Sequence, residues 1–131
     1  MRFLLDTNTC ISAMRHHARV VARMQALVPG DCAISTITSY ELFTGVAKCA
    51  NPALERAKVE SLLNAVAEIA FDANSAREAA RIRAELEARG TTIGPYDLLL
   101  AGQAIATGLT LVTHNTIEFA RVPGLALEDW Q

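Results

Sequence analysis

The sequence lacks the features of a membrane-spanning, secreted or disulfide-bonded protein. No apolar run among the 131 residues is long enough to cross a bilayer, and the first residues suggest a strand rather than a signal peptide. Cys10, Cys32 and Cys49 are odd in number and far apart, so they form neither a closed disulfide set nor a zinc pattern. We expect them to be reduced, which is typical of a cytoplasmic protein.

An excess of positive charge is also missing. The 12 Lys and Arg against 14 Asp and Glu give a formal net charge of −2, whereas nucleic-acid-binding domains are usually basic. The charge is unevenly distributed, because no acidic residue stands between Thr7 and Gly30. In this stretch Arg15, Arg19 and Arg23 recur at every fourth position. On a helix they would align in one basic stripe, which is either an ordinary solvated face or a contact for an RNA backbone.

Apolar side chains, in contrast, are abundant. They make up 51% of the residues, which is ample for the core of one domain over residues 1–131. Surplus apolar surface on a small domain is often hidden in a permanent interface, so we expect a homodimer. No repeat, linker or low-complexity tract divides the chain.

Short apolar runs alternate with helical patterns along the whole chain. The runs predict strands at Phe3–Leu5, Ala33–Ser35, Glu68–Phe71 and Thr110–Val112, with a weaker one at Leu125–Leu127. The patterns between them predict helices at Thr9–Met14, Arg19–Leu27, Thr38–Cys49, Pro52–Val66, Asp72–Gly90 and Tyr96–Thr107. This alternation is typical of a layered α/β fold with a mainly parallel sheet. In such sheets ligands bind beyond the carboxyl ends of the strands.

Three acidic residues stand out because of their surroundings. Asp6 ends the first apolar run in "MRFLLDTNT", Glu41 lies in "SYELF", and Asp97 lies in "PYDLLLAG". Each has an ordinary explanation when taken alone. Asp6 can cap a helix, and Asp97 suits a helix N-terminus. Thr38 and Glu41 match a capping box.

Taken together, these explanations are weaker. Glu41 and Asp97 lie in apolar runs with no Lys or Arg three or four positions away, and burying an unpaired charge is costly. Carboxylates that share one crevice repel each other, and Mg²⁺ or Mn²⁺ relieves the repulsion through oxygen ligands. Such clusters typically bind a metal that hydrolyses phosphate esters. The pattern therefore predicts a metal site formed by Asp6, Glu41 and Asp97.

A later strand end adds polar residues to this site. In "LVTHNTIEF", Thr113 ends a strand, and Asn115 and Glu118 follow it. Asn115 either takes part in the catalytic site by binding a metal-bound water or forms a plain Asx turn, and the two interpretations are about equal. Thr113 and Glu118 can support the site or contact the substrate. His114 has no second histidine at ligand spacing, so zinc is not expected.

Four stretches resemble the PIN-domain ribonucleases and, among them, the VapC-type toxins of bacterial toxin–antitoxin pairs. They are "LLDTN", "TSYELFTG", "GPYDLLLAGQA" and "LVTHNTIEFARVPGLALEDW", in the order and at the spacing of that family. The resemblance implies an α/β/α sandwich around a parallel sheet and an endoribonuclease that depends on Mg²⁺ or Mn²⁺. It also implies an antitoxin whose C-terminal segment places a polar or basic side chain at the carboxylates.

The same resemblance implies roles for individual residues. Asp6, Glu41 and Asp97 match the acidic core of the family, and Asp6 and Asp97 would be the direct metal ligands. Asn8 matches the small polar position after the first Asp. Asn115 stands where many members have a fourth Asp. The closing "VPGLALEDW" resembles the members that cut the anticodon stem-loop of initiator tRNA.

Two other functions stay open on the sequence alone. A phosphoacceptor signalling domain also has Asp residues at strand ends, but it needs a Lys after a late strand, where this chain has Thr113, His114 and Asn115. A non-catalytic α/β interaction module with a degenerate acidic pocket is the other possibility, since Asn115 is neutral.

Overall fold

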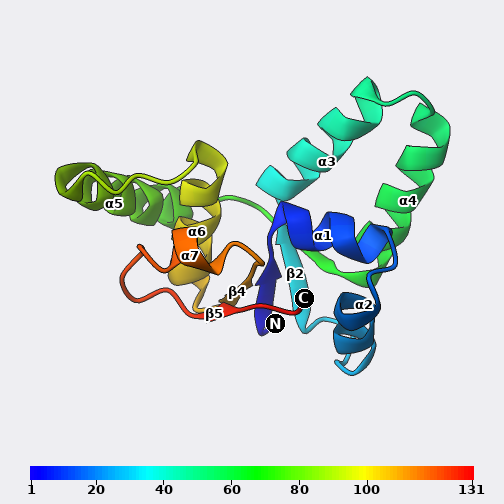
Figure 1. Ribbon diagram of the computed structural model, residues 1–131, viewed down its shortest axis with the longest axis horizontal. Coiled ribbons are helices and arrows are strands. Elements are labelled where there is room, and N and C mark those ends of the chain that lie inside the picture. The colour runs from blue at the N-terminus through cyan, green and yellow to red at the C-terminus, as the bar shows by residue number, and fades with distance from the viewer.

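A five-stranded sheet runs through the middle of the computed structural model, which describes residues 1–131 (Figure 1). The strands are β1 Phe3–Leu5, β2 Cys32–Ser35, β3 Ala67–Ile69, β4 Thr110–Val112 and β5 Leu127–Glu128. They lie in the order β3-β2-β1-β4-β5, and every adjacent pair is parallel. β1 is therefore the central strand, so residues just after it lie at the middle of the carboxyl edge.

Seven helices connect and cover these strands. They are α1 Thr7–Met14, α2 Ala18–Gln25, α3 Thr36–Lys48, α4 Pro52–Ala65, α5 Ala73–Arg89, α6 Pro95–Thr107 and α7 Thr116–Phe119. The first four lie on one side of the sheet and the last three on the other, so the predicted three-layer sandwich is confirmed (Figure 1). None of the helices combines the length and apolar character that crossing a membrane requires.

The alternation of side chains along the strands produces two cores. Leu4 and Ala33 pack into the core beneath α5 and α6. Leu5 and Ile34, their neighbours in the chain, pack into the core beneath α1–α4. All four are fully buried. Successive strand residues point to opposite faces, and burial on both faces is what a parallel sheet between helices requires.

The sequence predictions of the elements are mostly confirmed, with differences at their ends. β1 and β4 have the predicted bounds, whereas β3 and β5 are displaced along the chain by one or two residues. The helix predicted to begin at Thr38 begins at Thr36, because the side chain of Ser35 accepts a hydrogen bond from the Ile37 N–H at 3.0 Å and caps the helix there. Since β2 ends at that same Ser35, α3 starts directly at the carboxyl edge of the sheet.

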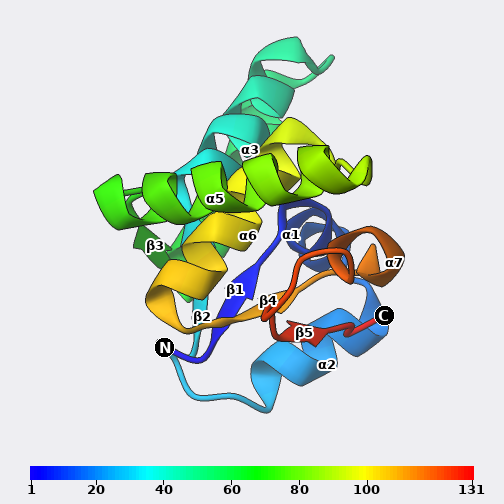
Figure 2. The ribbon, with the colours of Figure 1, turned by 90° about the vertical axis from the view of Figure 1, so that its left-hand side faces the viewer.

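A glycine sets the close contact between α5 and α6, where α5 crosses over the outside of α6 (Figure 2). A Cβ placed on Gly102 of α6 would lie 2.6 Å from the backbone nitrogen of Ala79 on α5. Backbone atoms cannot move aside as the end of a flexible side chain can. The helix that carries Asp97 is therefore positioned by a contact that admits only glycine.

We expect Gly102→Ala to lower the free energy of unfolding by about 1–3 kcal/mol, since an added methyl group must push two packed helices apart. Gly45→Ala is the matched control, because Gly45 is exposed on α3 and a Cβ there meets no atom within 4 Å. That control should gain about 0.5–1 kcal/mol from alanine's helix propensity. Urea unfolding measures both. Equal stability of Gly102→Ala and the unmodified protein would contradict the assigned contact.

Candidate functional site

Asp6 is buried at the carboxyl end of the central strand. Its side chain is 4% exposed, and its Oδ1 accepts a hydrogen bond from the Thr9 N–H at 2.8 Å, which caps α1. Its own N–H donates to the Val112 carbonyl of β4 at 3.0 Å. The ordinary explanation of Asp6 as a helix cap is therefore correct for one oxygen. The strand and the cap together hold the carboxylate rigidly at the centre of the carboxyl edge.

Glu41 lies on α3 and faces α1. The Thr7 hydroxyl donates to Glu41 Oε1 at 2.7 Å. The capping-box explanation for Glu41 is wrong, because Ser35 caps α3 and Thr38 lies inside the helix. Thr7 was not among the predicted site residues, although its place directly after Asp6 was a signal for it. The hydrogen bond from Thr7 brings Glu41 to the residues that follow β1.

Asp97 is the third residue of α6, and it does not cap that helix, whose N-cap Gly94 has no side chain to do so. The pKa of Asp97 is raised from 3.8 to about 6. Burial is the largest cause, followed by the negative charges of Glu118, Asp6 and Glu41. This half-buried carboxylate therefore experiences the charges of three others, and all of them come from different elements.

Glu118 connects α7 to the start of α6. Its Oε2 accepts from Asn115 Nδ2 at 2.7 Å, and its Oε1 accepts from the Gly94 N–H at 2.9 Å. These two bonds lower the pKa of Glu118, with the Asn115 bond the larger cause. Glu118 therefore stays ionised beside Asp97, and it fixes the turn from which Asp97 projects.

The other polar residues predicted for the site, Asn115, Thr113 and Asn8, differ in their hydrogen bonds and burial. The Asn115 side chain does not cap α7, so the Asx-turn interpretation is not supported. Thr113 is fully buried, and its Oγ1 accepts from the Asn115 N–H at 3.0 Å, which makes it a turn residue. Asn8 is exposed at the second position of α1, and no side-chain hydrogen bond ties it to the carboxylates.

The predicted basic stripe of Arg15, Arg19 and Arg23 is not continuous. α1 ends at Met14, and His16 has a φ of 60°, a left-handed conformation that breaks the helix. Only Arg19 and Arg23 share a helix, α2. Both bind the C-terminal segment, since Arg19 Nη1 donates to the Gln131 carbonyl at 3.3 Å and Arg23 Nη2 lies 3.3 Å from Glu128 Oε1.

The donor set of the site has the chemistry of a hard cation. Asp6, Glu41, Asp97 and Glu118 offer only oxygen, and the cysteine near Asp6, Cys10, is fully buried with its pKa raised, chiefly by that burial. No three acidic, histidine or cysteine side chains lie close enough to form a ready-made cage. Three of the four carboxylates already accept hydrogen bonds, namely Asp6 from Thr9, Glu41 from Thr7, and Glu118 from Gly94 and Asn115. The arrangement fits a cation bound by one or two carboxylates that keeps several waters, as Mg²⁺ does.

Two tyrosines beside the carboxylates also escaped the sequence analysis. Tyr40 precedes Glu41 and Tyr96 precedes Asp97, and their hydroxyl groups lie 3.2 Å apart. The pKa of Tyr96 is raised, first by this hydrogen bond and in smaller part by the charge of Glu41. The pair therefore lies beside the acidic site rather than elsewhere on the two helices.

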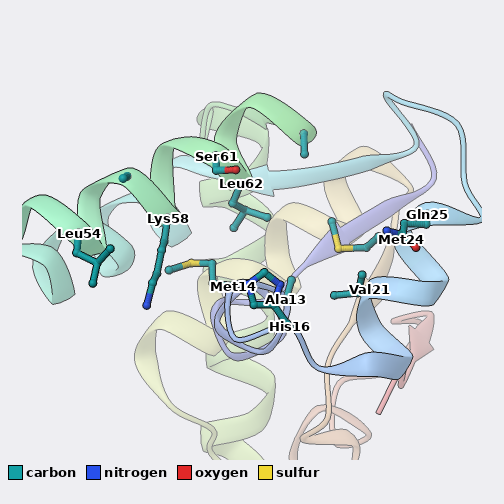
Figure 3. Close-up of a pocket in the computed structure, with 12 residues that line it drawn as sticks. Ala13, Met14, His16, Val21, Met24, Gln25, Leu54, Lys58, Ser61 and Leu62 are labelled. Carbon is teal, nitrogen blue, oxygen red and sulfur yellow. The ribbon is translucent and has the colours of Figure 1, made fainter.

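A separate apolar cavity of about 650 Å³ lies between α1, α2 and α4 (Figure 3). Met14, Val21, Met24, Leu54 and Leu62 are among the residues that line it, and none of the carboxylates described above does. Lys58 and His16 supply its polar side chains, with Gln25 and Ser61. The molecule thus has an acidic site at the sheet edge and, independently, an apolar groove on one helical layer.

Comparison with known proteins identifies the family. The family model of the PIN domain matches residues 3–125. The tRNA(fMet)-specific endonuclease VapC of Salmonella typhimurium is 38% identical over 130 residues, which cover 99% of this chain and 98% of the relative. Ribonuclease VapC2 of Rickettsia felis is also 38% identical, over 132 residues and with the same coverage.

Solved structures give the same result. The crystal structure of DNA-bound VapBC from Salmonella typhimurium matches with a TM-score of 0.95 at 38% identity, covering 100% of this chain and 99% of the other. The structure of VapBC2 from Rickettsia felis bound to a promoter DNA fragment matches with a TM-score of 0.93 at 37% identity over the full length of both. Nothing supports the alternative of a phosphoacceptor domain. The resemblance drawn from the four sequence stretches is confirmed, and the chain belongs to the PIN-domain family and, within it, to the VapC ribonucleases.

Proposed function

We propose that this protein is a divalent-metal-dependent endoribonuclease, the toxin of a toxin–antitoxin pair, and that it cuts the anticodon stem-loop of initiator tRNA. One observation supports the chemistry above the rest. The carboxylate of Asp97 is half-buried among Asp6, Glu41 and Glu118, with its pKa raised to about 6. A fold that keeps these charges together gains from a cation that neutralises them.

The choice of substrate follows from the relatives. The Salmonella protein that matches this chain over 99% of its length is named as specific for tRNA(fMet). The unpaired nucleotides of an anticodon loop expose both backbone and bases, so a protein can reach them without opening a duplex. We also propose that the protein acts in the cytoplasm, where its three cysteines would stay reduced.

Individual residues can be given roles in the hydrolysis. Asp6 and Asp97 would hold the divalent cation, Mg²⁺ or Mn²⁺, which when bound supplies positive charge and lowers the pKa of coordinated water. Glu41 uses one oxygen to accept from Thr7, so its other oxygen can orient the attacking water and take its proton. Asn115 is held by Glu118 through its NH₂ group, which leaves its carbonyl oxygen for the water.

A partner is part of the proposal. The related structures from Salmonella and Rickettsia are VapBC complexes. We propose that an antitoxin binds this chain in the same way and places apolar side chains in the groove between α1, α2 and α4 (Figure 3). Leu54, one of the residues that line that groove, is 55% exposed, so apolar surface of the groove is open to a partner. The homodimer stays a prediction.

The neutral Asn115 supports a second candidate, a non-catalytic module that keeps a degenerate acidic pocket. Cleavage of RNA separates the two functions, because metal binding alone is compatible with both.

Asp6→Asn and Asp97→Asn should each reduce cleavage of initiator tRNA by about 100-fold or more, since each removes a charge that the cation and the attacking water require. Labelled tRNA incubated with Mn²⁺, and then with EDTA, provides the assay. Glu85→Gln is the matched control, because Glu85 is an acid on α5 that pairs only with Arg81 and Arg89. Full activity of a folded Asp97→Asn variant would overturn the site, and no cleavage by the unmodified protein would favour the non-catalytic module.

The pH dependence of the free energy of unfolding tests whether the carboxylates lie close together, and it needs no cleavage assay. Because the pKa of Asp97 is raised from 3.8 to about 6, the folded state holds this proton more tightly than the unfolded state. In EDTA, the free energy of unfolding of the unmodified protein should therefore fall relative to Asp97→Asn as the pH rises from about 4 to about 6. Above about pH 6, the difference in the free energy of unfolding between the two proteins should no longer change.

A difference in the free energy of unfolding between the unmodified protein and Asp97→Asn that does not vary with pH would mean that Asp97 does not experience the neighbouring charges.

Millimolar Mg²⁺ at pH 7.5 should raise the Tm of the unmodified protein and leave that of Asp97→Asn nearly unchanged.

The groove is tested by Leu54→Glu, which places a charge where the partner would bury an apolar side chain. Co-expressed with the cognate antitoxin, the variant should lose most of the complex in a pull-down, while its Tm stays close to that of the unmodified protein. Val28→Glu is the control, since Val28 is 67% exposed and does not line the groove. Equal recovery of the antitoxin by Leu54→Glu and Val28→Glu would exclude the groove as the binding site of the antitoxin.

A further inference from the structure

Two tyrosines form an exposed aromatic pair at the rim of the acidic site. Tyr40 is 56% exposed and Tyr96 is 41% exposed. Their ring centroids lie 5.8 Å apart with the planes tilted by 56°, and their hydroxyl groups are hydrogen-bonded at 3.2 Å. The other aromatic residues are buried or half-buried, namely Phe3, Phe43, Phe71, Phe119 and Trp130. The aromatic surface of the protein is therefore concentrated at this position.

The pair is placed by the same helices that place the carboxylates. Tyr40 directly precedes Glu41 on α3, and Tyr96 directly precedes Asp97 on α6. Consecutive residues of a helix are turned by about 100° from one another, so each ring lies beside its carboxylate rather than behind it. α3 and α6 belong to opposite layers and contact each other at the carboxyl edge of the sheet. The two rings connect the layers there.

Nothing in the fold requires these rings to be exposed. Neither tyrosine fills a core, and their hydroxyl groups bond to each other, from α3 to α6. The mutual hydrogen bond and the ring contact fix the orientation of both side chains, so binding a flat ligand would cost little side-chain entropy. Exposed rings held in one orientation are how proteins stack unpaired nucleobases.

The charges of the protein make such a contact useful. Half of the basic side chains are engaged in ion pairs, namely Arg2, Arg23, Lys58, Arg81, Arg83 and Arg89. The net charge is −2 and the site itself is acidic, so the protein has no overall excess of positive charge for contacts to phosphates. Stacking on a ring needs no opposite charge.

We propose that Tyr40 and Tyr96 form the binding site for an unpaired nucleobase that flanks the bond to be cut. This inference rests on the proposed function in taking RNA as the substrate, and it adds how that RNA is held. The rings bind and position the substrate, while the carboxylates beside them carry the chemistry.

Binding is measured with a fluorescently labelled anticodon stem-loop of initiator tRNA, in an Asp97→Asn background so that the RNA stays intact. Tyr40→Ala and Tyr96→Ala should each raise the Kd by about 10-fold or more, the usual loss of one stacking side chain. Tyr96→Phe keeps the ring and should stay within about twofold of the parent, whereas Tyr96→Leu keeps only apolar bulk and should bind as weakly as alanine. The ratio of the Kd of each alanine variant to the Kd of the parent should be the same at low and high salt, because no charge is removed.

Cleavage by the otherwise unmodified protein gives a second readout. Tyr96→Ala should raise KM far more than it lowers kcat, because the ring holds substrate and takes no part in proton transfer. Ultraviolet cross-linking of the bound RNA should attach a nucleotide to Tyr40 or Tyr96, as located by mass spectrometry.

Alanine variants that fold and bind RNA as tightly as the parent would overturn the proposal alone. Unchanged RNA affinity of Tyr96→Leu would also overturn it, because an apolar contact without stacking would then be enough. Loss of dimers with unchanged RNA affinity would show that the pair is a contact between subunits and would also overturn it. If the unmodified protein neither binds nor cuts the RNA, the proposed function itself fails, and this inference fails with it.

Discussion

The mutual repulsion of carboxylates gathered at one edge of a parallel sheet is the constraint on which the other features of this structure depend. Asp6 follows the central strand. Glu41, Asp97 and Glu118 lie on three different helices, and Asp97 experiences the charges of the other three carboxylates. Hydrogen bonds from Thr9, Thr7 and Gly94 hold three of these side chains, those of Asp6, Glu41 and Glu118, in place against the repulsion. A protein maintains such an arrangement at a cost in stability, and the cost is understandable when a cation and an RNA phosphate are to be bound there.

The two sides of the site are built by opposite layers. α1 and α3 follow β1 and β2 directly, so the first residue of α1, Thr7, and the second turn of α3, which carries Glu41, lie at the sheet edge. α6 arrives from the other face, and its position is fixed by Gly102 against α5 and by Glu118 against its first turn. The distance between the acids of the two layers therefore depends on helix packing far from the chemistry.

The sequence predicted the elements and the acidic residues because both leave local signals. Strand-helix alternation, caps such as Asp72 and a terminal Gly90 are read from neighbouring residues. What the sequence could not show depends on contacts between distant segments. The link from Thr7 to Glu41 spans 34 residues, and that from Gly94 to Glu118 spans 24. The basic stripe failed for a local reason, since one left-handed residue, His16, separates two helices whose spacing looked continuous.

We infer that a cation binds among these particular carboxylates. Titration of the isotope-labelled protein with Mn²⁺ tests it most directly, because the ion broadens the NMR signals of nuclei close to it. Signals of Asp6, Thr7, Glu41 and Asp97 should disappear first, at substoichiometric Mn²⁺, and excess Mg²⁺ should restore them. Broadening that begins elsewhere, or none at millimolar Mn²⁺, would mean that no cation binds at these carboxylates.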